Sequence, residues 1–122
     1  MTEHPRTPAP ALAGSVTLSD DAVAQVVGHT VVECYGIVGM ASKSLAKGMA
    51  RMLTRDSLTQ GIEIARSGDE LRIDLYVIME YGLNLAEVAA TVRSRVAYEV
   101  ERQTGLHVAS VEVHVDDVRG SA

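Results

Sequence analysis

A chain of 122 residues is long enough for one compact domain and too short for two, and a hydrophobic fraction of 47% supports one core. Phe and Trp are absent, so this core must be built from Val, Leu, Ile, Ala and Met. The formal net charge of −5 argues against nucleic-acid binding through the whole surface, and the single cysteine excludes an internal disulfide. There is no stretch of about 20 apolar residues and no secretion signal, so we expect a cytoplasmic protein.

The chain begins with a segment that has no apolar periodicity. Residues 1–14 contain all three prolines, and we expect them to form a disordered tail. Residues 15–18 fit a short edge strand. A first helix is predicted to start after Ser19, because a serine suits the N-cap and two acidic residues follow it. Gly36 is expected to end this helix in a left-handed conformation. Its apolar positions recur at helical spacing: Val23, Val26, Val27, Val31 and Cys34.

A second helix is predicted over residues 42–53, and it has two distinct sides. Gly48 lowers its stability by roughly 1 kcal/mol relative to Ala. The apolar side carries Leu45, Met49, Met52 and Leu53, which we expect to pack on the domain because the core lacks Phe and Trp. The opposite side, continued one turn further, carries four cations that we call the basic stripe: Lys43, Lys47, Arg51 and Arg55.

The longest β signal lies in the middle of the chain. Residues 61–66 and 71–79 are joined by Ser67-Gly68-Asp69, which predicts an antiparallel hairpin. Strict alternation in the second run places five apolar residues on an inner face: Leu71, Ile73, Leu75, Val77 and Met79. The outer face of the same strand then carries Arg72, Asp74, Tyr76, Ile78 and Glu80.

A long helix and a last strand complete the pattern. Asn84 is a suitable N-cap with Glu87 three residues on, and Thr104-Gly105 marks the end of the helix. Its predicted buried stripe is Leu85, Val88, Ala89, Val92, Val96 and Val100. Residues 107–116 read as a strand, and residues 119–122 as a frayed terminus.

These elements predict an α/β (α+β) domain over residues 15–118. The sheet would be small and mixed, with three or four strands and the helices on one face. If residues 15–18 join the sheet, the order is that of a ferredoxin-like split β-α-β with a helical insert. Otherwise the sheet has three strands.

No catalytic, cofactor or metal site is predicted. Glu112, His114 and Asp116 share a strand face, but alternate residues stand about 7 Å apart, so a solvated outer face explains them better than one metal ion. Cys34 falls on the apolar stripe of the first helix, where a buried structural thiol is expected. Neither a nucleophile-elbow motif nor a phosphate-binding glycine motif occurs.

Two segments leave a binding role open. The basic stripe is either a solvated face or a contact with an acidic partner protein, an anionic membrane or nucleic acid. Gly36-Ile37-Val38-Gly39 matches the Gly-x-x-Gly loop of KH domains, although Ile37 and Val38 are better suited to packing than to phosphate binding. A KH-like regulatory domain that binds nucleic acid is therefore the alternative function.

The chain resembles the alkaline shock protein family of Gram-positive bacteria, also described as envelope stress response or general stress proteins. The resemblance covers residues 15–118 and is carried by Gly36-Ile37-Val38-Gly39-Met40, Gly61-Ile62-Glu63-Ile64, Ile73-Asp74-Leu75-Tyr76-Val77-Ile78, Tyr81-Gly82-Leu83-Asn84-Leu85-Ala86-Glu87-Val88, Thr104-Gly105-Leu106 and Val111-Glu112-Val113-His114-Val115.

This resemblance implies a non-enzymatic scaffold or stress-response protein that acts through protein–protein interaction. It would be cytoplasmic and peripheral to the inner face of the cell membrane, held there by a membrane-embedded anchor protein or by related family members. It would also form a homo-oligomer, with neither a small-molecule substrate nor a cofactor. The partner-binding candidates are the basic stripe (Lys43, Lys47, Arg51 and Arg55) together with Tyr76 and Ile78.

Overall fold

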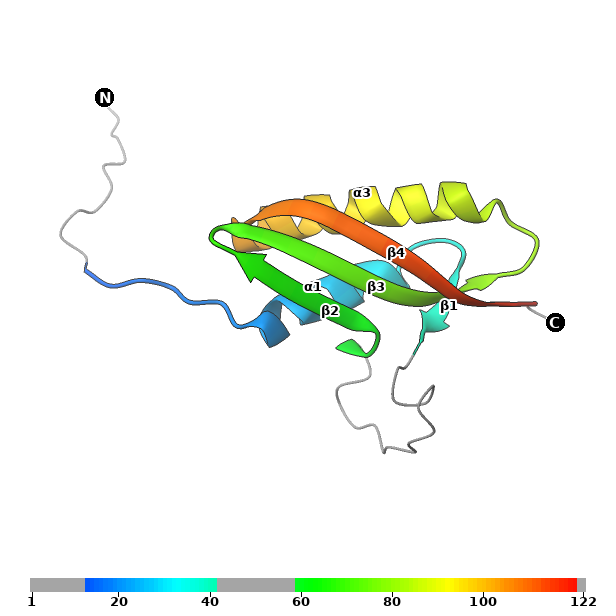
Figure 1. Ribbon diagram of the computed structural model, residues 1–122, viewed down its shortest axis with the longest axis horizontal. Coiled ribbons are helices and arrows are strands. Elements are labelled where there is room, and N and C mark those ends of the chain that lie inside the picture. Colours follow the sequence, from blue (N-terminus) through cyan, green and yellow to red (C-terminus); the bar gives the residue numbers. More distant parts are fainter. Residues whose placement is uncertain (1–12, 42–58, 121–122) are drawn as a thin grey trace, which may run out of the picture.

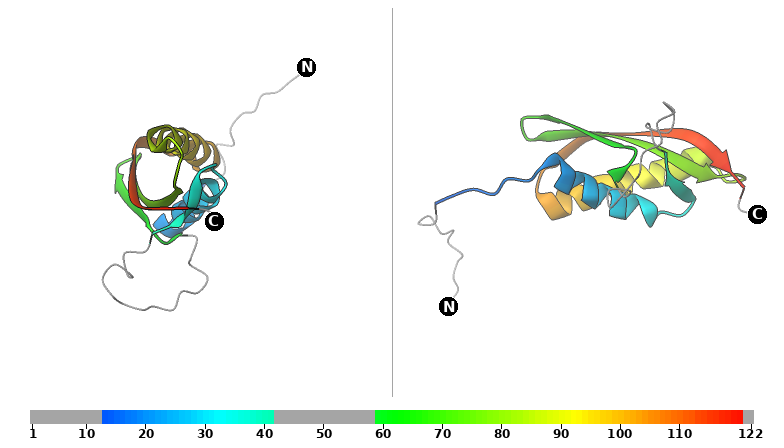
Figure 2. Two further views of the ribbon diagram at one scale, coloured as in Figure 1. Left: turned by 90° about the vertical axis from the view of Figure 1, so that its right-hand side faces the viewer. Right: turned by 90° about the horizontal axis from the view of Figure 1, so that it is seen from below.

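The computed structural model describes residues 13–41 and 59–120 (Figure 1). The four strands in these residues form one mixed sheet, and both helices lie on the same side of it (Figure 2). The predicted class, a small mixed sheet with helices on one face, is confirmed. The elements follow the order α1 (Asp20–Val32), β1 (Ile37–Met40), β2 (Ile62–Ser67), β3 (Glu70–Glu80), α3 (Leu85–Thr104) and β4 (His107–Arg119).

Strand β3 lies at the centre of the sheet. β4 runs parallel to it along one edge, in register from Glu70 opposite His107 to Glu80 opposite Arg119. The other edge is shared by two antiparallel strands, because β2 pairs with residues 70–75 and β1 with residues 77–79. Where β1 and β2 meet, the Tyr76 carbonyl accepts the Ala41 N–H at 2.8 Å, and the Tyr76 N–H donates to the Gly61 carbonyl at 2.8 Å. Both edges of β3 are therefore occupied.

The inner face of β3 forms the floor of the core. Its five predicted apolar residues are exposed by 1% or less, as alternation requires. Both helices pack on this floor, and α3 does so through valines spaced four apart. The helix residues that complete the core are Val23, Val27 and Val31 from α1 and Val88, Val92, Val96 and Val100 from α3.

The predicted helix starts are confirmed by their cap geometry. The Ser19 Oγ accepts the Ala22 N–H at 3.0 Å, and the Asn84 Oδ1 accepts the Glu87 N–H at 3.1 Å. Gly105 ends α3 with a φ of +79°. The end of α1 is different from the prediction, because the helix stops at Val32 and Gly36 lies in the turn that leads into β1.

The predicted strand at residues 15–18 is wrong, so the ferredoxin-like order, which was conditional on that strand, is not confirmed. These residues have no strand pairing, and Arg66 of β2 instead holds their end through the Leu18 carbonyl at 2.6 Å and the Asp20 carboxylate at 2.7 Å. The fourth strand is β1, whose residues were not predicted to form a strand. Because β1 and β2 already fill one edge of β3 and β4 fills the other, β3 has no edge left for residues 15–18.

The last strand is longer than predicted. β4 continues to Arg119, so this residue is paired rather than frayed. The pairing shifts between Val115, opposite Val77, and Asp117, opposite Ile78, which leaves Asp116 as the extra residue of a bulge. Several predictions lie outside the described residues: residues 1–12 of the predicted tail at 1–14, the helix at residues 42–53, the basic stripe and residues 121–122. The domain limits 15–118 stay a prediction.

Two glycines with similar φ angles provide a test of packing at the turn after α1. A Cβ on Gly36 (φ +93°) would lie 2.9 Å from one Val88 methyl group and 3.1 Å from Leu83 Cδ1, whereas one on Gly82 (φ +100°) would meet no atom within 4 Å. Both alanine substitutions carry a backbone cost of roughly 1–2 kcal/mol. We expect Gly36→Ala to lower the free energy of unfolding by about 1–3 kcal/mol more than Gly82→Ala, because it also overpacks the core. Urea denaturation measures the difference, and equal losses would contradict this packing.

Candidate interaction surfaces

The sheet face opposite the helices is not covered by any other element among the residues that the structure describes (Figure 2). We call it the bare face. As alternation predicts, β3 contributes Arg72, Asp74, Tyr76, Ile78 and Glu80 to it, and pairing places Ser110, Glu112, His114, Asp117 and Arg119 of β4 beside them. Tyr76 and Ile78, the two predicted partner-binding residues in the described part of the chain, are both partly exposed here.

The centre of the bare face is a stacked pair of rings. Tyr76 and His114 are directly opposite on β3 and β4, and their ring centroids lie 4.5 Å apart with 12° between the planes. The His114 Nε2 also lies 3.0 Å from the Asp74 Oδ1. The imidazole is therefore held between an aromatic ring and a carboxylate, which gives the bare face an ordered polar centre.

These contacts change the interpretation of Glu112, His114 and Asp116, which the sequence placed on one face of the last strand. His114 pairs with Asp74 of the neighbouring strand, and the bulge at Asp116 breaks the alternation that grouped this residue with Glu112 and His114. Within residues 13–41 and 59–120, no three His, Cys, Asp or Glu side chains are placed to hold one metal ion. The bulge and the pair with Asp74 depend on how two strands meet, so the sequence of β4 alone could not reveal them.

A second surface, at the start of α3, was not predicted. We call it the apolar end, and its residues are Tyr35, Tyr81, Leu83, Leu85 and Val118. Leu83 lines two hollows, of about 270 and 480 Å³. Tyr35 and Tyr81 beside them are 76% and 74% exposed. The sequence does contain a signal for this surface: Tyr81 and Leu83 lie in the turn before α3, where polar residues are usual.

The glycine-rich turn does not form the loop that a KH domain needs. Ile37, Val38 and Gly39 belong to β1, which pairs with β3, and Ile37 packs against the core. Their backbone groups are in a sheet instead of in a loop open to phosphate. The proposed match to a KH loop is therefore wrong.

Cys34 is buried, as predicted. The residue is 5% exposed, and its thiol donates to the Thr30 carbonyl at 3.5 Å. Burial raises the pKa of this thiol, although Arg95 nearby opposes the shift. A thiol in this environment is a poor nucleophile.

Fold and surfaces together define a small α+β domain with its helices on one face of the sheet and, among the described residues, a bare opposite face. The model of the alkaline shock protein 23 family, described as having a cell envelope-related function, matches residues 9–120. The chain belongs to this alkaline shock protein family, and the resemblance drawn from its motifs is confirmed. No helix within the described residues is both long and apolar enough to span a membrane.

Three curated relatives extend this finding. YloU of Bacillus subtilis (strain 168) is 39% identical over 107 residues, which are 87% of this chain and 89% of YloU. Spy1614 of Streptococcus pyogenes serotype M6 is 35% identical over 107 residues, or 87% of this chain and 88% of that protein. A stress response regulator gls24 homolog of Streptococcus pyogenes serotype M1 is 25% identical over 109 residues, 89% of this chain but 61% of that longer protein. The family thus links the chain to the cell envelope and to stress-response relatives.

The environment of Cys34 predicts its reactivity. At pH 8 the raised pKa leaves less thiolate than a free cysteine would have, and the core covers the sulfur. We expect the native protein to react with a thiol reagent such as DTNB at least about tenfold more slowly than the urea-unfolded protein, since the thiolate is the reacting form. The rise of absorbance with time gives both rates, and its end point should correspond to one thiol in each state. Equal rates would contradict a buried Cys34.

Proposed function

We propose that this protein is a non-enzymatic scaffold of the envelope stress response, and that it acts through protein–protein contacts and self-association. The family's envelope-related description supports the setting. We further propose a position at the inner face of the cell membrane, with a membrane-embedded anchor protein or a related family member as the partner. The observation that carries self-association is the bare face, because both helices of the described residues lie on the other side of the sheet.

The composition of the bare face suits contact between two copies of the chain. Ile78 and Tyr76 supply apolar area near the centre, and charges of both signs, such as Arg72 and Glu112, lie around them. A two-fold axis would place the same patch on both partners, so that a cation of one copy can face an anion of the other. The ordered Tyr76–His114 pair reduces the entropy that such a contact would cost.

The chemistry of the described side chains supports a role without catalysis. Cys34 is buried with a raised pKa, and His114 is held by Tyr76 and Asp74. Neither is arranged as a nucleophile with an adjacent general base.

Ile78→Lys tests self-association through the bare face. A lysine here would place a charge in the apolar centre of the contact, so we expect the dissociation constant to rise by about tenfold or more. Size-exclusion chromatography with light scattering over a concentration series measures it. Val32→Lys is the matched control, because Val32 is 47% exposed on α1 and lies on the side of the sheet opposite the bare face. A wild-type protein that stays monomeric at high concentration, or equal behaviour of both variants, would contradict the proposal.

We propose that the basic stripe faces the anionic membrane surface or an acidic segment of the anchor protein. Each cation contributes about 1 kcal/mol near an anionic membrane before screening, so four give weak binding and the partner must supply most of the affinity. Changing Lys43, Lys47, Arg51 and Arg55 to Gln should lower cosedimentation with anionic liposomes and with native membranes, and raised salt should do the same to the wild type. Equal recovery of both proteins would reduce the stripe to a solvated face, whereas selective loss of RNA binding would favour nucleic acid.

A further inference from the structure

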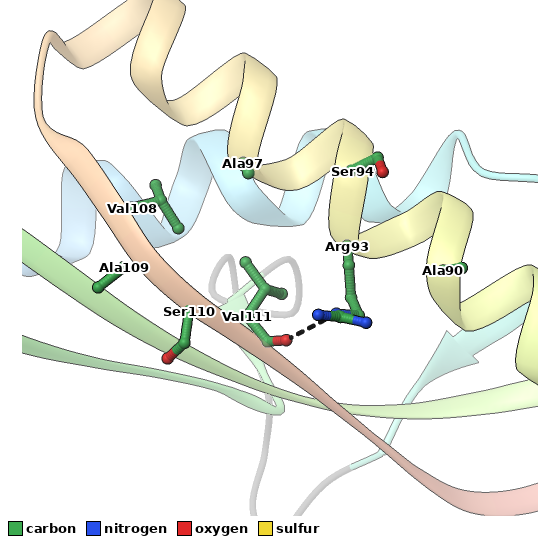
Figure 3. A pocket seen from close by; sticks show the side chains of 8 residues that line it. All are labelled: Ala90, Arg93, Ser94, Ala97, Val108, Ala109, Ser110 and Val111. Carbon is green, nitrogen blue, oxygen red and sulfur yellow. Dashed lines mark hydrogen bonds between the residues drawn. The ribbon is translucent and has the colours of Figure 1, made fainter.

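The outer edge of β4 borders a groove that shares only Ser110 with the bare face among the described residues. Among the described strands β4 pairs only with β3, so its other edge is open, and α3 runs beside it. A hollow of about 320 Å³ lies between the two elements (Figure 3). It is lined by residues 108–111 of β4 and by Ala90, Arg93, Ser94 and Ala97 of α3. We call it the β4 groove, and its small side chains leave room beside the strand edge.

Two backbone groups of this edge are bound by side chains of α3. The Val111 carbonyl accepts a hydrogen bond from the Arg93 Nε at 3.2 Å, so it faces the helix and not β3 (Figure 3). The Val108 N–H donates to the Glu101 Oε2 at 2.8 Å. Since backbone groups alternate between the two sides of a strand, those of Val113 and Val115 point to the same open edge as those of Val111. An edge of this kind is a template for another strand.

Arg93 retains most of its capacity to donate. The guanidinium has five N–H groups, and the hydrogen bond to Val111 uses one of them. Arg93 is the only cation that lines the β4 groove among the described residues. A guanidinium with free donors in this position fits a carboxylate, which it can bind through two parallel hydrogen bonds.

We propose that an extended segment of a partner protein adds to the open edge of β4 in this groove and places an acidic side chain against Arg93. A backbone N–H of the added strand would replace Arg93 as the donor to the Val111 carbonyl, so no polar group is left without a partner and the guanidinium is freed for the carboxylate. The Val108 N–H remains hydrogen-bonded to Glu101, so the added strand can pair only with the part of β4 that follows residue 108.

The length of the edge decides which carboxylate is expected. β4 extends on both sides of Val111, from His107 to Arg119, so an added strand can run past Arg93 in either direction. This arrangement favours an acidic side chain within the segment over a carboxylate at the end of a chain. The β4 groove and Ile78 also lie on different parts of the sheet, and the two kinds of contact can be tested separately.

An NMR titration of the full-length, ¹⁵N-labelled protein tests the proposal. The probe is the capped peptide acetyl-Thr-Val-Lys-Val-Glu-Val-Thr-amide, with a second peptide that has Gln in place of Glu. We expect shift changes at residues 109–115 and around Arg93, and about tenfold weaker binding of the Gln peptide. Arg93→Gln should abolish the difference between the two peptides, while the matched control Arg72→Gln, an exposed arginine on the bare face, should preserve it.

Three further measurements make the result specific. Ala90→Phe should fill the groove and abolish binding without any change in charge, and the amide spectrum shows whether the variant is folded. Methylation of alternate peptide nitrogens should abolish binding for one set and preserve it for the other, because only one edge of an added strand contacts β4. The Ile78→Lys variant should bind the Glu peptide with the same affinity as the wild type, even if the substitution disrupts self-association. The proposal is overturned if millimolar peptide causes no shifts, if the shifts are confined to the β3 residues of the bare face, such as Tyr76 and Ile78, or if both methylated sets bind equally.

Discussion

The alternation of β3 is the constraint on which the rest of the structure depends. Its five inner side chains are exposed by 1% or less and belong to one core cluster with the buried residues of both helices, and the other three described strands all pair with it. Burial of these residues fixes the register, since a slip of one residue would turn all five to the solvent and bring charged residues into the core. The same constraint sends Tyr76 and Ile78 to the opposite face, where no helix among the described residues covers them.

Because the core lies on one side of the sheet, the opposite face and the outer edge of β4 are not paired with any other described element. The bare face has an ordered centre, because Tyr76, His114 and Asp74 hold one another in place. The open edge of β4 is protected at two points by charged side chains of α3, which is how natural proteins limit strand pairing at an edge. The two surfaces differ in geometry, so one protein could contact a second copy and a different partner at the same time.

The motifs that identify the family can now be explained by packing. Gly36 lies where a Cβ would meet Val88 and Leu83, so the turn after α1 and the turn before α3 must approach closely. Gly61 is similarly confined, since a Cβ there would lie 2.5 Å from the Ala41 carbonyl oxygen and 2.8 Å from that of Tyr76. Only glycine, which has no Cβ, allows neighbouring segments to approach this closely at these two sites. Each of the two glycines is the first residue of one of the family motifs.

The sequence by itself determined the features that depend on neighbouring residues. The caps at Ser19 and Asn84, the hairpin turn at Gly68, the stop at Gly105 and the two faces of β3 follow from local chemistry and from a period of two, and they placed Tyr76 and Ile78 correctly. Only the tertiary structure decided that Ile37–Met40 forms a strand, that His114 pairs with Asp74, and that Arg93 reaches the Val111 carbonyl. Each of these contacts joins residues far apart in the chain, and their partners are selected by which edge of β3 is free and by how α3 lies beside β4, which no local pattern records.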